Sequence, residues 1–178
     1  MFAAHELKQK NMAEYLLYMW RVEDIIRAFD ADIEKIDTQL IAGMNLTAEQ
    51  RKAEYEWYES LIDMMRREGC LQKGHIQLVK NALIDLEDIH LSLLQTAEGV
   101  EYKAKYYQLQ PSLTLLKSKS SDPTISDLEM CFVFLYCMMN LRQEKAAISE
   151  DTERTAKQAA GLLAMLSRAY TIAKEENQ

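Results

Sequence analysis

The chain has 178 residues, of which 48% are hydrophobic and 28% charged, and its formal net charge is −7 at pH 7. This composition is typical of a folded protein. The acidic balance argues against nucleic-acid binding, which needs a basic surface. Gly and Pro number only 5 and 2, and because tight turns need these residues, their scarcity argues against a β-sandwich, a barrel or another turn-rich β fold. The length predicts a single domain over residues 1–178, or at most two very small ones.

The first expected element is a long helix. Apolar residues recur every three or four positions from Met12 to Leu40, which places them on one face of an α-helix. No Gly or Pro interrupts this pattern before Gly43, so we expect a first helix of about 35–40 residues. Asp30 and Asp32 could cap a new helix, and a bend near them is the alternative.

Two further helices follow in the first half of the chain. Thr47 and Gln50 have the spacing of a capping box, which predicts a helix start at Thr47. Gly69 predicts its end, because glycine readily takes the left-handed conformation found after helices. The third helix is expected from near Gly74, with His90 on its apolar stripe.

Gly99 separates the third helix from a fourth. Pro111 falls inside the fourth pattern, where it removes a backbone donor and predicts a kink or a restart. The apolar stripe of this helix consists of Tyr102, Tyr106, Leu109, Leu113 and Leu116.

The last third of the chain predicts a loop over residues 118–123 and two more helices. Ser126 begins the fifth helix, which is apolar nearly all round from Met130 to Met139 and is therefore expected to be covered on every side. Ser149 caps the sixth. The fold class is therefore all-α, a bundle of about six antiparallel helices.

The sequence indicates a cytoplasmic protein. No signal peptide is visible at the start of the chain. The longest apolar run, Met130–Met139, is about half as long as a membrane span, so no membrane partner is expected. The chain has three cysteines and no C-x-x-C pair, which favours reduced thiols in the cytosol over a disulfide framework.

A metal site is the main chemical alternative. Glu87 and His90 form an E-x-x-H motif, which places a carboxylate and an imidazole on one helical face. Di-iron bundles use two such motifs, whereas this chain has one, and His90 also lies on an apolar stripe. We therefore interpret His90 as a hydrogen-bonded core residue and predict no cofactor. A single metal ion held by Glu87, His90 and a further carboxylate such as Asp24 or Glu129 stays open.

Other candidate sites have weaker motifs. Arg21 could form a half-buried ion pair or hold an anionic ligand. Cys70 and His75 could form a nucleophile pair only if the thiol were exposed and activated. No phosphate-binding loop occurs. We therefore predict no catalytic residue and do not expect an enzyme.

The segment from His5 through Asp32, above all Ala13–Asp24 (AEYLLYMWRVED), resembles a bacterial domain-of-unknown-function family of small all-helical proteins. The resemblance extends over the whole chain in length and helix order. It implies an all-helical bacterial protein with no assigned activity, and no site residue follows from it.

Helix length predicts association. A straight first helix of about 40 residues would span about 60 Å, whereas a compact chain of this size has a diameter of roughly 40 Å. The helix must therefore bend near Asp30 to Asp32, belong to an elongated bundle, or reach a partner with its far half. We expect the last of these, because the far half would expose an apolar stripe suited to the interface of a homodimer. We therefore expect a non-catalytic bundle that acts through protein–protein contacts, with a further, unidentified protein partner as an open possibility. The predicted interface residues are Ile33, Ile36, Leu40 and Ile41.

Overall fold

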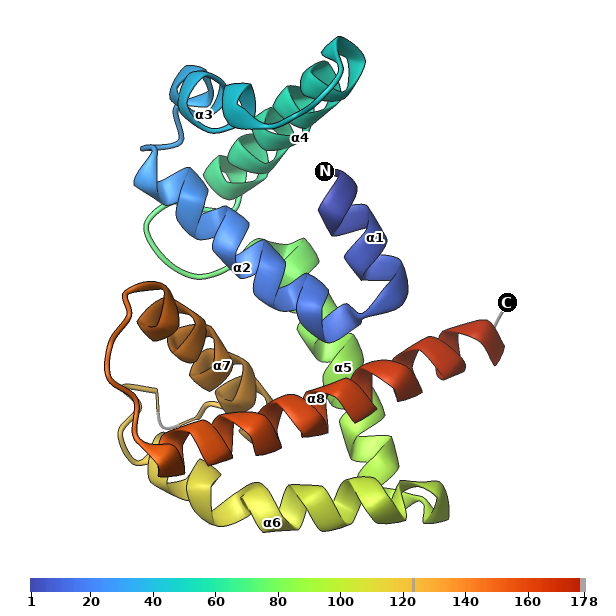
Figure 1. The fold of residues 1–178 in the computed structure, drawn as a ribbon. Helices are drawn as coiled ribbons and strands as arrows, with labels where there is room; N and C mark the ends of the chain where they lie inside the picture. Colours follow the sequence, from blue (N-terminus) through green and yellow to red (C-terminus); the bar gives the residue numbers. More distant parts are fainter. Residues whose placement is uncertain (123, 177–178) are drawn as a thin grey trace. The chain divides into compact units, whose positions relative to one another are not determined.

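The computed structural model describes residues 1–122 and 124–176, apart from the side chain of Glu98. These residues form eight α-helices and two short 3₁₀ helices without a strand, so the all-α prediction is confirmed (Figure 1). Pro123, in the predicted loop, lies outside the described residues. The helices are α1 (Phe2–Lys10), α2 (Met12–Ala28), α3 (Ile33–Gln39), η1 (Ile41–Gly43), α4 (Ala48–Arg67), α5 (Gln77–Gln95), η2 (Ala97–Gly99), α6 (Val100–Lys117), α7 (Asp127–Gln143) and α8 (Glu150–Glu176).

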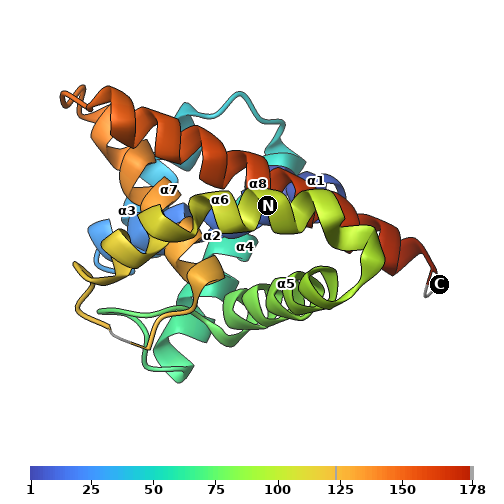
Figure 2. The same cartoon turned by 90° about the horizontal axis from the view of Figure 1, so that it is seen from below.

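Contacts between the helices divide the chain into two compact units, Met1–Ala82 and Leu83–Gln178. In the first unit α1 packs on α2, and α4 contacts both α2 and α3. In the second unit α6, α7 and α8 pack on one another, with α6 running alongside α8 (Figures 1 and 2). Helix α5 runs through the boundary between the units, and the single domain expected from the length stays a prediction.

The predicted first helix over residues 12–40 is broken after α2, so the long helix is wrong and the alternative of a bend is confirmed. Asp30 and Ala31 have φ angles of 57° and 55°, a left-handed conformation that costs a non-glycine residue roughly 1–2 kcal/mol. Asp32 then begins α3, because its side chain accepts hydrogen bonds of 3.0 and 3.2 Å from two backbone N–H groups of the first turn.

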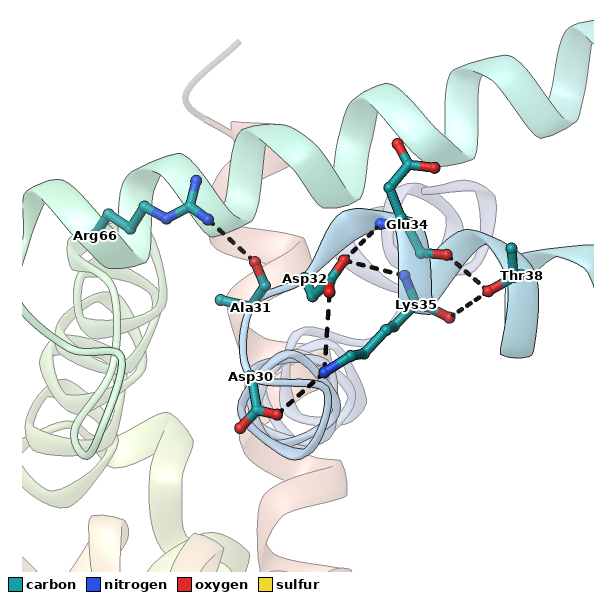
Figure 3. A network of polar contacts seen from close by, with 7 residues as sticks. All are labelled: Asp30, Ala31, Asp32, Glu34, Lys35, Thr38 and Arg66. Atoms are coloured by element: carbon teal, nitrogen blue, oxygen red, sulfur yellow. Dashed lines mark hydrogen bonds and ion pairs between the residues drawn. The ribbon is translucent and has the colours of Figure 1, made fainter.

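Polar contacts hold this bend (Figure 3). Arg66 of α4 donates a 3.1 Å hydrogen bond to the carbonyl oxygen of Ala31. The Lys35 ammonium lies 3.3 Å from a carboxylate oxygen of Asp30 and 3.8 Å from one of Asp32. A hydrogen bond from α4 thus helps to hold Asp30 and Ala31 in a left-handed conformation that non-glycine residues disfavour.

Two predicted helix starts and one predicted end are confirmed. Thr47 and Gln50 form a capping box, with hydrogen bonds of 3.2 and 3.0 Å between each side chain and the other residue's backbone. Ser126 accepts a 2.9 Å hydrogen bond from the backbone N–H of Glu129 at the start of α7. Gly69 follows α4 with a φ of 68°.

Helix α6 continues through Pro111, so the predicted restart is wrong. Pro111 cannot donate to the carbonyl of Tyr107 four residues earlier. Both residues are exposed, so the missing hydrogen bond lies on the uncovered face of α6. Before α6 the chain turns closely at Gly99, where an added Cβ would lie 1.8 Å from the carbonyl oxygen of Leu93.

Helix α7 provides much of the core of the second unit. It packs on both α6 and α8, as expected for a helix that is apolar nearly all round. Cys137 is nevertheless exposed, so the coverage is incomplete. The buried side chains of α7 are Leu128, Met130, Cys131, Phe132, Phe134, Leu135 and Met138.

Candidate functional site

The core of the second unit contains a histidine between two tyrosines. His90 of α5 is only 5% exposed, and its Nδ1 forms a 2.6 Å hydrogen bond with the hydroxyl of Tyr102. Its ring meets those of Tyr102 and Tyr106 edge to face, with centroid separations of 5.6 and 5.1 Å. This geometry agrees with the interpretation of His90 as a hydrogen-bonded core residue.

Glu87, one turn before His90, has a different partner. Its carboxylate accepts a hydrogen bond from the hydroxyl of Ser126. Burial raises the pKa of Glu87, and the nearby negative charges of Glu129 and Asp127 raise it further. The motif therefore places Glu87 beside the start of α7 and His90 against Tyr102.

The structure gives the metal alternative no geometric support. Within residues 1–122 and 124–176, no three side chains of the metal-binding types lie close enough together to hold an ion. Asp24, considered as a further ligand, is in the first unit and forms a 2.8 Å ion pair with Arg27. Glu129 lies near enough to Glu87 to influence its pKa, but the pair does not complete a site with His90.

A second cluster of hydrogen-bonded polar side chains, which the sequence did not predict, joins α6 to α7. The Tyr106 hydroxyl donates a 2.6 Å hydrogen bond to Asp127, which also accepts one of 2.9 Å from Lys117. Burial and the bond to Asp127 raise the pKa of Tyr106 to about 12. Although burial opposes it, the donors Lys117 and Tyr106 keep the pKa of Asp127 below its usual value. These groups stabilise the helix pair.

Acidification is expected to destabilise the protein through His90. Burial lowers the pKa of His90 in the folded chain, although Asp127 opposes this, whereas the unfolded chain titrates near 6.5. As pH falls through about 6.5, the unfolded state binds a proton that the folded state does not, so stability falls by at most about 1.4 kcal/mol per pH unit. Urea titrations at about pH 7.5 and 5.5 measure the loss.

Two histidine variants isolate this effect. His90→Gln should show a smaller loss on acidification than the wild type, because it removes the buried titrating group. His5→Gln, at an exposed position in α1, should show the wild-type loss. An equal loss in His90→Gln and the wild type would contradict the assignment.

In the first unit Glu23, and not the nearby Arg21, forms a buried polar contact. Arg21 is exposed, so the expected half-buried pair at that position is wrong. Glu23 is 1% exposed, and it accepts a 2.9 Å hydrogen bond from the backbone N–H of Ile76 while its other oxygen lies 2.5 Å from His75 Nδ1. The His75 ring also stacks on Trp20, with centroids 4.6 Å apart.

The proposed nucleophile pair of Cys70 and His75 is not supported. Cys70 is buried, and this burial raises the pKa of its thiol, as do the charges of Glu23 and Glu68. His75 is bonded to Glu23. Arg27 donates to the carbonyl oxygens of Cys70, at 3.0 Å, and Gly74. The side chains of α2 thus hold the loop before α5 in place.

The predicted dimer interface is largely internal. Ile36 and Ile41 are 0% and 1% exposed, and Ile33 and Leu40 are half-buried. Because the chain bends before α3, this helix packs on α4 and η1. The same chain therefore covers Ile36 and Ile41, which leaves Ile33 and Leu40 as the partly exposed members of the predicted interface.

A groove of about 620 Å³ lies in the second unit among side chains of α5, α6 and α8. Its apolar lining includes Ile89, Leu93 and Met165. The volume lies in the range of small-molecule sites. However, Glu101 and Arg168 also line it, so charges of both signs are present and no one ligand chemistry is selected.

The outer face of α6 is apolar and exposed. Tyr102, Tyr106, Leu109 and Leu113 face the core, as predicted. The opposite face carries five residues at helical spacing, which we call the α6 stripe. The α6 stripe consists of Val100, Ala104, Tyr107, Pro111 and Leu115, all exposed, with Val100 at 67%, Tyr107 at 60% and Leu115 at 59%.

Other exposed apolar residues do not form such a stripe. Ile84 and Leu91 of α5 are 53% and 51% exposed, but Asp88 lies between them on the same helical face. The α6 stripe contains no charged residue along its length. The sequence analysis did not predict the α6 stripe, because α6 is apolar on two faces. Periodicity alone does not show which of these two faces the other helices cover.

No helix in the described part of the chain has the length and apolar character needed to cross a membrane. Residues 1–177 match the model of the family described as Domain of unknown function (DUF4924). The chain belongs to this family. Searches of the curated proteins and of the solved structures found no significant match.

Proposed function

We propose that this protein is a non-catalytic bacterial protein of the cytoplasm that acts through protein–protein contacts, beginning with its own homodimerisation. The observation that carries this proposal is the α6 stripe. Exposed apolar residues scattered singly need no explanation, whereas a continuous apolar strip is typical of an interaction surface. The three free cysteines are compatible with a reducing compartment.

The stripe offers enough apolar surface to favour association. Val100, Tyr107 and Leu115 each retain more than half of their surface in water. Complete burial of an apolar side chain of this size contributes about 1.5–3 kcal/mol. Aromatic residues such as Tyr107 are also enriched among the interface residues that contribute most of the binding free energy.

Light scattering tests the proposal. At micromolar concentration the wild type should scatter as a particle of twice the 20.6 kDa chain mass. Leu115→Glu should scatter as the single chain, because pairing would bury its added charge. Circular dichroism should show unchanged helix content, since Leu115 is exposed.

Ile84→Glu is the matched control, because Ile84 is similarly exposed on α5. This variant should keep the wild-type mass. A wild-type chain that remains monomeric would overturn the homodimer, and a dimer that tolerates Leu115→Glu would show that α6 does not form its interface.

A further inference from the structure

We infer that two copies of the chain pair through the α6 stripe in antiparallel orientation, with the two-fold axis crossing α6 beside Tyr107. The inference rests on the proposed function, and it names the partner, the helix and the register. Helix α6 is visible along its full length in the second unit, beside α8 (Figure 2).

The spacing of the stripe is symmetric. Val100 and Leu115 lie equally far from the midpoint between Tyr107 and Gln108, and so do Ala104 and Pro111. A two-fold axis through this midpoint therefore places Val100 against Leu115 of the second copy. It also places the small side chain of Ala104 against Pro111 of the second copy, and the two Tyr107 rings meet near the axis. Isologous interfaces require this self-complementarity.

The charges beside the stripe favour the antiparallel direction. Glu101, Lys103 and Lys105 all lie in the first half of α6. The second half has uncharged polar residues beside the stripe, namely Gln108, Gln110, Ser112 and Thr114. Antiparallel pairing places charged residues opposite uncharged ones, whereas parallel pairing would place each charge beside the same charge of the second copy. Opposed helix dipoles favour the same direction.

Helix α8 adds a polar rim on one side of α6. Arg154 and Lys157 line a shallow groove with Lys105 and Gln108. The chain itself compensates these positive charges. Arg154 lies 2.7 Å from a carboxylate oxygen of Asp151, Lys105 pairs with Glu101 at 3.7 Å, and Lys157 is close enough to Glu153 to lower its pKa. The arrangement is that of an apolar centre with a paired polar edge.

Single-cysteine variants distinguish the register from its alternatives. The background is Cys137→Ser, which removes the exposed native thiol and leaves the buried Cys70 and Cys131. Val100 and Leu115 are about 22 Å apart along the helix, far beyond the Cβ separation of about 3.5–4.5 Å that a disulfide needs. Each variant is oxidised under mild conditions and examined by non-reducing electrophoresis, with light scattering on the reduced protein.

The expected result is a specific pattern of cross-links. Val100→Cys alone and Leu115→Cys alone should remain uncross-linked, whereas a mixture of the two should form a covalent dimer. Tyr107→Cys alone should cross-link to itself. Ile84→Cys is the control for random collision and should cross-link no faster than the background chain.

Three results would overturn the inference. Self-cross-linking of Val100→Cys would indicate parallel helices. A wild-type dimer in which no α6 cysteine cross-links would place the interface elsewhere and leave the proposed self-association intact. A monomeric wild-type chain would overturn both proposals, and the α6 stripe would then be interpreted as a binding surface for a different protein.

Discussion

Phe132→Ala is expected to lower the free energy of unfolding by about 3–5 kcal/mol. Phe132 is 0% exposed in α7, a helix that packs on both α6 and α8. Truncation removes the transfer free energy of the ring and leaves a cavity that the neighbouring helices fill only in part. Urea unfolding followed by circular dichroism measures the change.

Cys137→Ala is the matched control, because Cys137 lies on the same helix but is exposed. Its effect should stay within about 0.5 kcal/mol. A loss below about 1 kcal/mol for Phe132→Ala would show that α7 is not the core helix of the second unit.

The local features of this fold could be predicted from the sequence because their determinants are neighbours in the chain. The capping box of Thr47 and Gln50 requires contacts over three residues, and it forms as predicted. The same holds for Ser126 at the start of α7. The apolar stripe of α6 from Tyr102 to Leu113 was also predicted from periodicity, and its residues are buried.

The bend after α2 shows where local reasoning left two outcomes open, because Asp32 could cap a new helix while the apolar periodicity favoured one long helix. Asp30 and Ala31 do not prefer positive φ strongly enough to predict a break, and the apolar periodicity continues past them. The contact that stabilises the bend comes from Arg66, which the sequence places in a different helix. A tertiary contact therefore stabilises this helix boundary together with the local Asp32 cap, and Ile36 and Ile41 are buried within the chain.

The buried contact of Glu23 and the exposed α6 stripe were missed for a related reason. Glu23 lies on a helix with other charged residues, and its burial depends on His75 and Ile76 far along the chain. The α6 stripe is exposed because the other helices of the second unit cover the opposite face. Periodicity identifies apolar faces, but only packing decides which of them meets water.

Glu23→Ala should lower the free energy of unfolding by about 2–4 kcal/mol. The substitution removes the acceptor of the Ile76 backbone N–H and the partner of His75. Ile76 is 0% exposed, so its N–H would remain buried without a partner. Arg27 would still bind the carbonyls of Cys70 and Gly74, and the damage should therefore concentrate at the start of α5.

Hydrogen exchange separates this local effect from a general loss of stability. The Ile76 amide should lose more protection in Glu23→Ala than amides in the middle of α4. Glu23→Gln is the matched control, because its amide oxygen can still accept from Ile76 while the negative charge beside His75 is gone. Protection at Ile76 should largely return in Glu23→Gln. If the two variants lose protection equally at this amide, the charge of Glu23 and not its acceptor role stabilises the junction before α5.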